Sequence, residues 1–598
     1  MPKMGLKSLF LFKTSPSPSS AKPFSHSLLD ENIEIARSII SKWDLIPSSH
    51  QTSSIKPATV PLFSNTRQEA KQYLKAVTSL QSTMHHLVAL DSSSESLVQA
   101  QFLMQLAMKR LQTEFYRILA ENKDNLDPES VISTDRRSSS VSEDEDNFSE
   151  DEYRFAGGSV STVAMADLKA IAECMVSAGY SKECVKIYII MRKSILDEAL
   201  YHLGVERLSF SQVQKMDWGV LESKIKCWVN SVQVAVQTLF RGEKSLCDYV
   251  FGSAERKIAD SCFAAICGDG AATLFGFPDN VAKCKKTTEK MFRMLDLYNA
   301  ICENQQQIES IFSSESTSSI ILQVCASKAR LGEAIRTMLI NFESAIHKES
   351  SKIPVPGGGI HPVTRYVMNY IAFLADYKDA LSEIVADWPQ NPLPESYYRS
   401  CDREGVNRSS GIAERIAWLI LGLLCKLDAK AELYREVALS YLFLANNMQY
   451  VVVKVRTSNL GLILGDHWLT KHELRVKEYV SKYEGVGWSK VLSTPPENPT
   501  AEQARAILES FMFAFREACR AQSSWVVPDP NLRDEIKASI ATKFEPIYKV
   551  FFEKYQLGPD AVFGCSPNYF EKSISDILTG CVSSSQTAPS PPHRLKRR

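Results

Sequence analysis

The chain has 598 residues, and its 69 Lys+Arg balance its 69 Asp+Glu, so no net charge drives the whole molecule onto nucleic acid or a membrane. Hydrophobic residues at 44% and charged residues at 23% are typical of a folded protein, which excludes a wholly disordered chain. Glycine, at 25 residues, is scarce, which disfavours collagen-like sequences and turn-rich all-β folds. The 14 cysteines include no C-x-x-C pair and indicate reduced thiols in a cytosolic protein rather than disulfides or a zinc site.

Residues 1–27 form a basic, Ser-rich opening with Lys3, Lys7, Lys13 and Lys22 and no acid before Asp30. Its only strongly apolar stretch, residues 9–12, is too short for the core of a signal peptide, so secretion is not expected. The composition predicts a disordered basic tail. An organellar transit peptide is the alternative.

Residues 28–122 are predicted to form an N-terminal helical region. Two series of apolar residues there recur with the spacing of one helix face, namely Tyr73, Val77, Leu80, Met84 and Leu87, and Met104, Met108, Leu111, Phe115 and Ile118. These patterns predict two amphipathic helices that need packing partners.

Residues 123–158 lose the helical period, and residues 141–152 contain seven acids among twelve residues. Such a block repels itself and stays solvated, which predicts an acidic disordered loop. The alternative interpretation adds a phosphorylation switch at Ser138, Ser142 and Ser149, where phosphates would modulate docking to a basic partner.

Residues 159–351 are predicted to form helical bundles. Leu221, Ile225, Trp228, Val232 and Ala235 continue the helical spacing, and residues 218–251 read as one helix of about nine turns. Long helices, few glycines and no alternating strand pattern predict an all-α fold, an elongated rod of stacked antiparallel helical bundles.

Residues 352–360 contain Pro354, Pro356 and three consecutive glycines, and this segment is predicted to be a flexible Pro/Gly connector. No Gly-Lys-Ser/Thr follows the glycines, so the segment is not a phosphate loop. Residues 361–490 are predicted to form the central C-terminal bundle. Its apolar run at residues 416–425 reaches about half of a roughly 30 Å hydrocarbon core, which indicates a buried helix and no membrane span.

The common enzyme signatures G-x-S-x-G, G-x-G-x-x-G and H-E-x-x-H and the EF-hand loop do not occur. His472 has no second histidine four residues later, and the adjacent His85 and His86 point about 100° apart on a helix. We therefore expect no catalytic residue, no metal ligand, no cofactor, no nucleic-acid partner and no small-molecule substrate.

Residues 491–582 are predicted to form the last helical bundle, with a helix over residues 532–555. The candidate lipid-binding bases are Arg533, Lys537, Lys543, Lys549 and Lys554, joined by Arg594, Lys596, Arg597 and Arg598 in the predicted disordered basic tail at residues 583–598. The five helix bases do not share one face, so a solvated helix surface is the alternative to a membrane patch. Four tail charges at roughly 1 kcal/mol each supply only about millimolar affinity, so attachment needs several weak contacts together.

Three segments carry a family resemblance: "ELYREVALSYLFLANNMQYVVVKVRTSNLGLILGDHW" at residues 432–468, "HPVTRYVMNYI" at residues 361–371 and "WVVPDPNLRDEI" at residues 525–536. They resemble the Exo-seventy family of exocyst subunits, in family order, and the likeness runs from about residue 167 to residue 577. The acidic interruption and Ser-rich basic N-terminus are similar to the plant branch. Within the resembling segments, Asn446 and Asn447 are interpreted as backbone-binding residues, and Tyr366, Tyr450 and Trp468 as large core or interface anchors.

The resemblance implies a non-enzymatic rod within a complex that tethers secretory vesicles to the plasma membrane before fusion. It implies other exocyst subunits, Rho-type GTPases and an anionic phosphoinositide membrane surface as partners, and a cytoplasmic protein peripherally associated with the plasma membrane and secretory vesicles. Residues 556–570 contain no base where many relatives are more basic, so weak lipid binding is expected. The alternative is a divergent paralogue that acts as a helical adaptor in immunity or selective autophagy without stable complex assembly.

Overall fold

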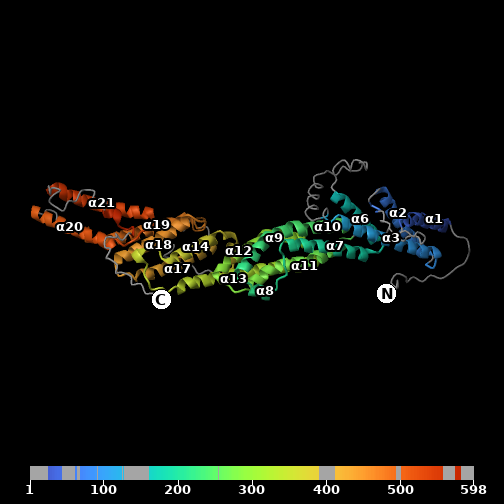
Figure 1. Cartoon of the computed structure of the whole chain (residues 1–598), viewed down its shortest axis with the longest axis horizontal. Coiled ribbons are helices and arrows are strands. Elements are labelled where there is room, and N and C mark those ends of the chain that lie inside the picture. The colour runs from blue at the N-terminus through green and yellow to red at the C-terminus, as the bar shows by residue number, and fades with distance from the viewer. Residues whose placement is uncertain are drawn as a thin grey trace, which may run out of the picture. The chain divides into compact units, whose positions relative to one another are not determined.

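The computed structural model describes residues 24–43, 61–63, 67–90, 92–123, 126, 160–252, 255–388, 411–492, 500–555 and 573–580. Helices make up nearly all of these residues (Figure 1), and the pairing of extended backbone described within them is an isolated antiparallel bridge between Val526 and Thr579. The predicted all-α fold class is confirmed. The described residues up to Cys284, together with Ala300–Lys328, form one compact unit, and Lys285–Asn299 with the residues from Ala329 onward form a second.

The first unit begins with α1 (Phe24–Ser41), α2 (Arg67–Leu90) and α3 (Glu95–Glu121), which pack against one another. The two predicted amphipathic helices are α2 and α3, and nearly all of the predicted stripe is buried. Met84, the exception, is half-buried. The core between these helices also encloses an ion pair between Arg110 and Glu114, whose atoms Nη2 and Oε1 are 2.6 Å apart.

The unit continues through α6 (Val160–Ser177), α7 (Ser181–His202), α8 (Phe210–Lys215), α9 (Trp218–Val234), α10 (Arg241–Phe251) and α11 (Arg256–Ala282). The helix predicted over residues 218–251 exists, but it is not α-helical throughout. Between α9 and α10 the backbone forms a π-helical segment, η1 (Ala235–Phe240), whose wider turns shift the register of the following residues.

Among the described helices, α11 has the length and apolar composition that a membrane crossing requires. It lies instead in the core of the first unit, where residues from Ala259 to Ala282 are buried at helical spacing. Trp228 Nε1 donates a 2.8 Å hydrogen bond to the carbonyl of Leu274, and Ser327 Oγ donates a 3.0 Å bond to that of Phe275. Packing against protein on these sides explains the apolar composition of α11.

Two long helices, α12 (Met291–Ile311) and α13 (Ser318–Lys348), contribute residues to both units. The second unit then contains α14 (Pro362–Ala375), α15 (Lys378–Val385), α17 (Gly411–Ala431), α18 (Val437–Arg456), α19 (Leu460–Gly487), α20 (Ala501–Gln522) and α21 (Pro530–Tyr555). Short 3₁₀ turns lie at η2 (Thr288–Lys290), η3 (Glu315–Thr317) and η4 (Pro356–Gly358).

The core at the C-terminal end of the second unit is formed by apolar faces of α18, α19, α20 and α21 around Trp488, which is 1% exposed. Ile574, Ile577 and Leu578, from the described segment 573–580, complete this core. The backbone N–H of Val527 donates a 3.0 Å hydrogen bond to the carbonyl of Leu578. The segment that precedes α21 and the segment that follows it are thereby joined.

Candidate functional site

The predicted lipid-binding bases of α21 are held to other parts of the protein. Arg533 Nη1 donates a 3.4 Å hydrogen bond to the carbonyl of Val527, and Lys537 Nζ donates a 2.6 Å bond to that of Ser575. Burial, followed by the charge of Arg533, lowers the pKa of Lys537. These two bases are half-buried and contact neighbouring backbone, so they do not extend freely into solvent.

Lys543 makes an ion pair with Glu484 of α19. The Glu484 carboxylate is buried and also accepts a 3.1 Å hydrogen bond from Ser539 Oγ, whereas the Lys543 side chain is 43% exposed. The pair joins α19 to α21 and gives Lys543 a structural role that its sequence position did not reveal. No local motif marks Glu484, because its partner lies 59 residues away.

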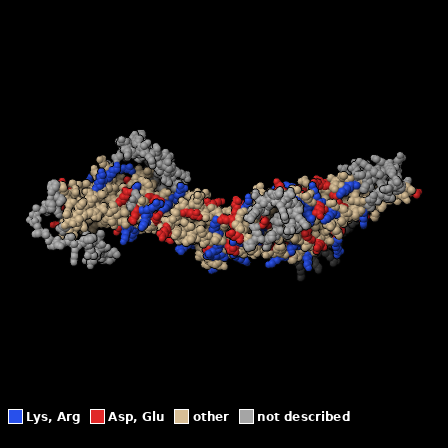
Figure 2. Space-filling view, turned by 180° about the vertical axis from the view of Figure 1, so that it is seen from behind, with Lys and Arg blue, Asp and Glu red and all other residues tan. Residues whose placement is uncertain are grey.

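The other predicted site residues are only partly covered by the structure. Lys549 and Lys554 lie on α21, but their side chains are outside the described residues. Also outside the described residues are Arg594, Lys596, Arg597 and Arg598 and the phosphorylation candidates Ser138, Ser142 and Ser149. On the face shown in Figure 2, basic and acidic side chains are interspersed.

Two asparagines of α18 bind the backbone of neighbouring segments, as predicted from the sequence. Asn446 Nδ2 donates hydrogen bonds of 2.8 Å and 2.7 Å to the carbonyls of Gly358 and Val526. Asn447 Oδ1 accepts a 2.9 Å bond from the backbone N–H of His361 and a 2.7 Å bond from Thr364 Oγ1. The pair therefore attaches the Pro/Gly segment and the start of α14 to α18.

This attachment contradicts the flexible connector predicted for residues 352–360. Gly357 and Gly358 have positive φ angles of 64° and 70°, and the Gly357 carbonyl accepts a 2.8 Å bond from Val526 N–H. A Cβ atom on Gly357 would lie 2.6 Å from the carbonyl oxygen of Ser524. The glycines allow close packing of backbone against backbone rather than free movement.

The large anchors predicted from the sequence differ in burial. Trp468 is buried and stacks on His472 with ring centroids 3.7 Å apart, and Tyr450 is half-buried. Tyr366, by contrast, is 54% exposed, which excludes the core alternative for it and leaves the interface alternative as a prediction. Its ring lies 6.1 Å from that of Phe342. Its position on the outer side of α14 accounts for the difference.

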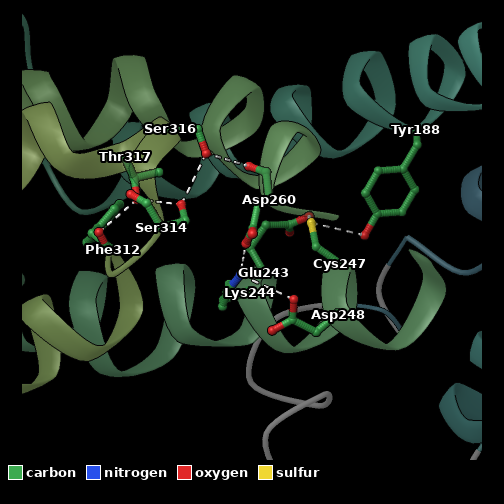
Figure 3. A network of polar contacts seen from close by, with 10 residues as sticks. All are labelled: Tyr188, Glu243, Lys244, Cys247, Asp248, Asp260, Phe312, Ser314, Ser316 and Thr317. Carbon is green, nitrogen blue, oxygen red and sulfur yellow. Dashed lines mark hydrogen bonds and ion pairs between the residues drawn. The ribbon is translucent and has the colours of Figure 1, made fainter. Parts of the chain in front are cut away.

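A buried polar network lies within the first unit, and Figure 3 shows part of it. Arg192 of α7 pairs with Glu243 of α10 at 2.7 Å, and both side chains are nearly inaccessible to solvent. The Cys247 thiol donates to the Tyr188 hydroxyl across 3.8 Å. Burial raises the pKa of the Tyr188 hydroxyl and of the Cys247 thiol, and the charge of Glu243 raises that of Cys247 further. The thiol therefore stays protonated and is a poor nucleophile.

The solvent side of this network is formed by Lys244, which pairs with Asp260 of α11 at 2.6 Å and with Asp248 at 3.2 Å. Ser316 of η3 donates a 3.4 Å hydrogen bond to the Asp260 carbonyl. Figure 3 shows these groups linking α10, α11 and η3. Together with the protonated thiol of Cys247, this arrangement fixes helix positions and offers no activated nucleophile.

The histidines considered from the sequence lie in different environments. His85 and His86 are exposed on α2, whereas His472 is buried in the second unit, where burial lowers its pKa to about 4. Within the parts of the chain that the structure describes, no three His, Cys, Asp or Glu side chains are grouped to hold a metal ion.

Comparisons with known proteins match most of the chain. Residues 226–576 match the C-terminal family model of the Exo70 component of the exocyst complex, and residues 32–121 match the Exo70 N-terminal model. Exocyst complex component EXO70B1 of Arabidopsis thaliana is 31% identical over 509 residues, which cover 80% of this chain and 78% of that protein. EXO70A1 of the same plant is 28% identical over 585 residues, which cover 93% of this chain and 88% of that protein.

A solved structure of Exo70 from S. cerevisiae superimposes with a TM-score of 0.55 and covers 94% of this chain and 99% of the yeast chain. The sequences are 15% identical in this alignment. At that identity the match establishes a shared fold.

Proposed function

This chain belongs to the Exo70, or Exo-seventy, family of exocyst subunits, and on that premise we propose that it tethers secretory vesicles to the plasma membrane before fusion. The observation that carries the proposal is the match to the C-terminal family model over residues 226–576, more than half of the chain. Its relatives are exocyst components, so other exocyst subunits are its expected partners.

The proposed mechanism is multivalent and non-enzymatic. Helical surfaces bind sister subunits and a Rho-type GTPase, while Arg533, Lys537, Lys549 and Lys554, together with the bases at residues 594–598, add a weak grip on phosphoinositides. The contacts of Arg533 and Lys537 with Val527 and Ser575 support a modest lipid contribution, because a head group must compete with them. The protein is cytoplasmic and reaches the plasma membrane and vesicles through these contacts.

The acidic segment supplies a proposed regulatory element. Phosphates on Ser142 and Ser149 add negative charge next to existing acids, and a phosphate on Ser138 adds it next to Arg136 and Arg137. The added charge changes docking to a basic partner. Phosphopeptide mapping of the purified protein, followed by comparison of Ser→Ala and Ser→Asp variants in partner binding, tests this role.

Quantitative affinity purification from native tissue tests the tethering function. A tethering subunit brings down its sister subunits in stoichiometric amounts. Recovery of immune or autophagy proteins with sister subunits absent would refute tethering and support the divergent adaptor. A variant that breaks one interface with a sister subunit without unfolding the chain is the matched control.

A further inference from the structure

A cleft of about 370 Å³ opens inside the second unit between α17, α18 and α19. Its apolar wall is made of Leu421, Leu424 and Leu427 of α17, Leu444 and Met448 of α18, and Tyr479 of α19. Well-packed interiors leave few voids larger than a water molecule, and a volume of this size lies in the range of small-ligand sites. The cleft is therefore large enough to hold a small ligand.

The apolar wall is accessible from the mouth of the cleft. Leu421, Leu424 and Leu444 are only half-buried, although they line a concave surface. Water in contact with three leucines is released when an aliphatic chain covers them, which favours binding. Met448 adds an adaptable side chain at the floor.

One side of the cleft carries basic groups. Lys471 and Arg475 are four residues apart on α19, so both lie on the helix face that lines the cleft. Arg475 is held in place by Glu478 at 2.9 Å and by the Tyr479 ring, whose centroid lies 5.3 Å from the guanidinium carbon. His472 also lines the cleft and is neutral near pH 7, since burial lowers its pKa to about 4.

A single acid, Asp428 of α17, lines the other side. Burial raises the pKa of its carboxyl group, while the positive charge of Arg475 acts in the opposite direction. Asp428 therefore competes with any bound anion for electrostatic interaction with Arg475. The lining itself carries two bases and one acid, and Glu478, outside the lining, offsets part of the charge of Arg475.

We propose that this cleft binds a single-chain anionic amphiphile, with the aliphatic chain against the leucines of α17 and α18 and the carboxylate at Lys471 and Arg475. Arg475 Nη1 already donates to Glu478, so the carboxylate of the ligand takes other N–H groups of the same guanidinium, which has five donors. This binding site goes beyond the tethering function and does not depend on it.

Calorimetric titration of the full-length protein tests the proposal with octanoate as the probe and 1-octanol and octyltrimethylammonium as neutral and cationic probes of equal chain length. Octanoate binds saturably and more tightly than both. Arg475→Gln weakens octanoate binding about tenfold and leaves 1-octanol binding unchanged, as expected for one charged hydrogen-bonding group. Asp428→Asn strengthens octanoate binding, and Arg520→Gln on the exposed surface of α20 is the matched control without effect.

Filling the cleft provides a second test. Cys425 lines the cleft and is exposed, so Cys425→Trp blocks the mouth without disturbing a buried core side chain, and Cys425→Ser keeps the volume. Cys425→Trp abolishes binding of both octanoate and 1-octanol, whereas Cys425→Ser retains it. In the wild type, octanoate slows alkylation of Cys425 by iodoacetamide, measured by peptide mass spectrometry.

Circular dichroism confirms that each variant is folded. Absence of saturable octanoate binding to the wild type overturns the proposal. Binding that is unchanged in both Arg475→Gln and Cys425→Trp overturns it as well, because the ligand then lies elsewhere.

Discussion

At the scale of single residues, the buried Glu484 shows how a charge is placed inside a helical core. Its carboxylate forms an ion pair with Lys543 of α21 and accepts a hydrogen bond from Ser539, while the rest of the surrounding cluster is apolar. A carboxylate that loses its partner in such a place keeps its desolvation cost without compensation. Lys543 therefore stabilises the contact between α19 and α21, and its predicted lipid contact stays a prediction.

We expect Lys543→Gln to lower the free energy of unfolding by about 1–2 kcal/mol, a value reduced for the partial exposure of Lys543. Urea unfolding of the purified protein measures the change. Lys482→Gln, which removes an exposed pair with Glu478, is the control and is expected to have a much smaller effect, because solvent screens that pair. Equal effects of the two substitutions would contradict the structural role of Lys543.

His472 makes stability depend on pH. Because burial lowers its pKa in the folded state from 6.5 to about 4, the unfolded chain binds a proton more readily between these values. The stability that the neutral His472 contributes to the folded protein is fully present above pH 6.5. It is lost as the pH falls towards 4, by about 3 kcal/mol in total. Asp167, whose pKa burial raises to about 6, acts in the opposite direction in part of this window.

We therefore expect His472→Gln to flatten the fall in unfolding free energy between pH 6.5 and pH 4. Comparing wild type and variant at each pH removes the contribution of Asp167, which both share. His85→Gln, at an exposed position of α2, is the control substitution of a histidine that the core does not enclose. An identical pH profile for the His472 variant would show that its imidazole is not desolvated in the folded protein.

At the scale of elements, the Pro/Gly segment and the long helix of residues 218–251 both depart from their local sequence pattern. Prolines and three glycines favour a loop, but Asn446, Asn447 and Val526 bind its backbone from positions more than 80 residues away. The apolar stripe from Leu221 to Ala235 predicts a helix, but it does not specify the π turns that follow. Only packing of the surrounding helices decides both.

Substitution of the glycines tests how tightly the segment is held. Gly357→Ala is expected to lower the free energy of unfolding by about 2–3 kcal/mol, because it combines a left-handed backbone with a close contact to Ser524. Gly359 has a negative φ angle, and a Cβ atom there would have no neighbour closer than 3.6 Å. Gly359→Ala is therefore expected to lower the free energy of unfolding by less than about 1 kcal/mol. Chemical denaturation compares the two. Similar losses at both positions would argue for a loosely held segment.

At the scale of the whole molecule, the positive and negative charges balance, so membrane attachment depends on local groups of basic residues. With 69 bases and 69 acids, the chain has no long-range attraction to anionic lipid. The interspersed charges on the face in Figure 2 fit this expectation. Any lipid grip must come from a few bases near the surface, and it must weaken in salt.

We expect the double substitution Arg533→Gln/Lys537→Gln to decrease flotation with phosphoinositide-containing liposomes about tenfold. Each base near an anionic surface contributes roughly 1 kcal/mol to binding, and the hydrogen bonds that Arg533 and Lys537 already make within the protein reduce this contribution. Raising the salt from about 50 to about 500 mM should have a similar effect on the wild type, because it shortens the Debye length. The matched control is Lys226→Gln, an exposed base of α9. Flotation that resists both the double substitution and salt would assign membrane binding to other residues.

The sequence by itself determined the helical class, the amphipathic helices α2 and α3, the helix α21 and the backbone-binding role of Asn446 and Asn447. Helical periodicity and short-range polarity are local properties, so a pattern of a few turns carries them. The sequence did not reveal the Lys543–Glu484 pair, the fixed Pro/Gly segment, the exposed Tyr366 or the cleft between α17, α18 and α19. Each of these depends on side chains far apart in the sequence, and only packing of the helices brings such side chains together or leaves one outside.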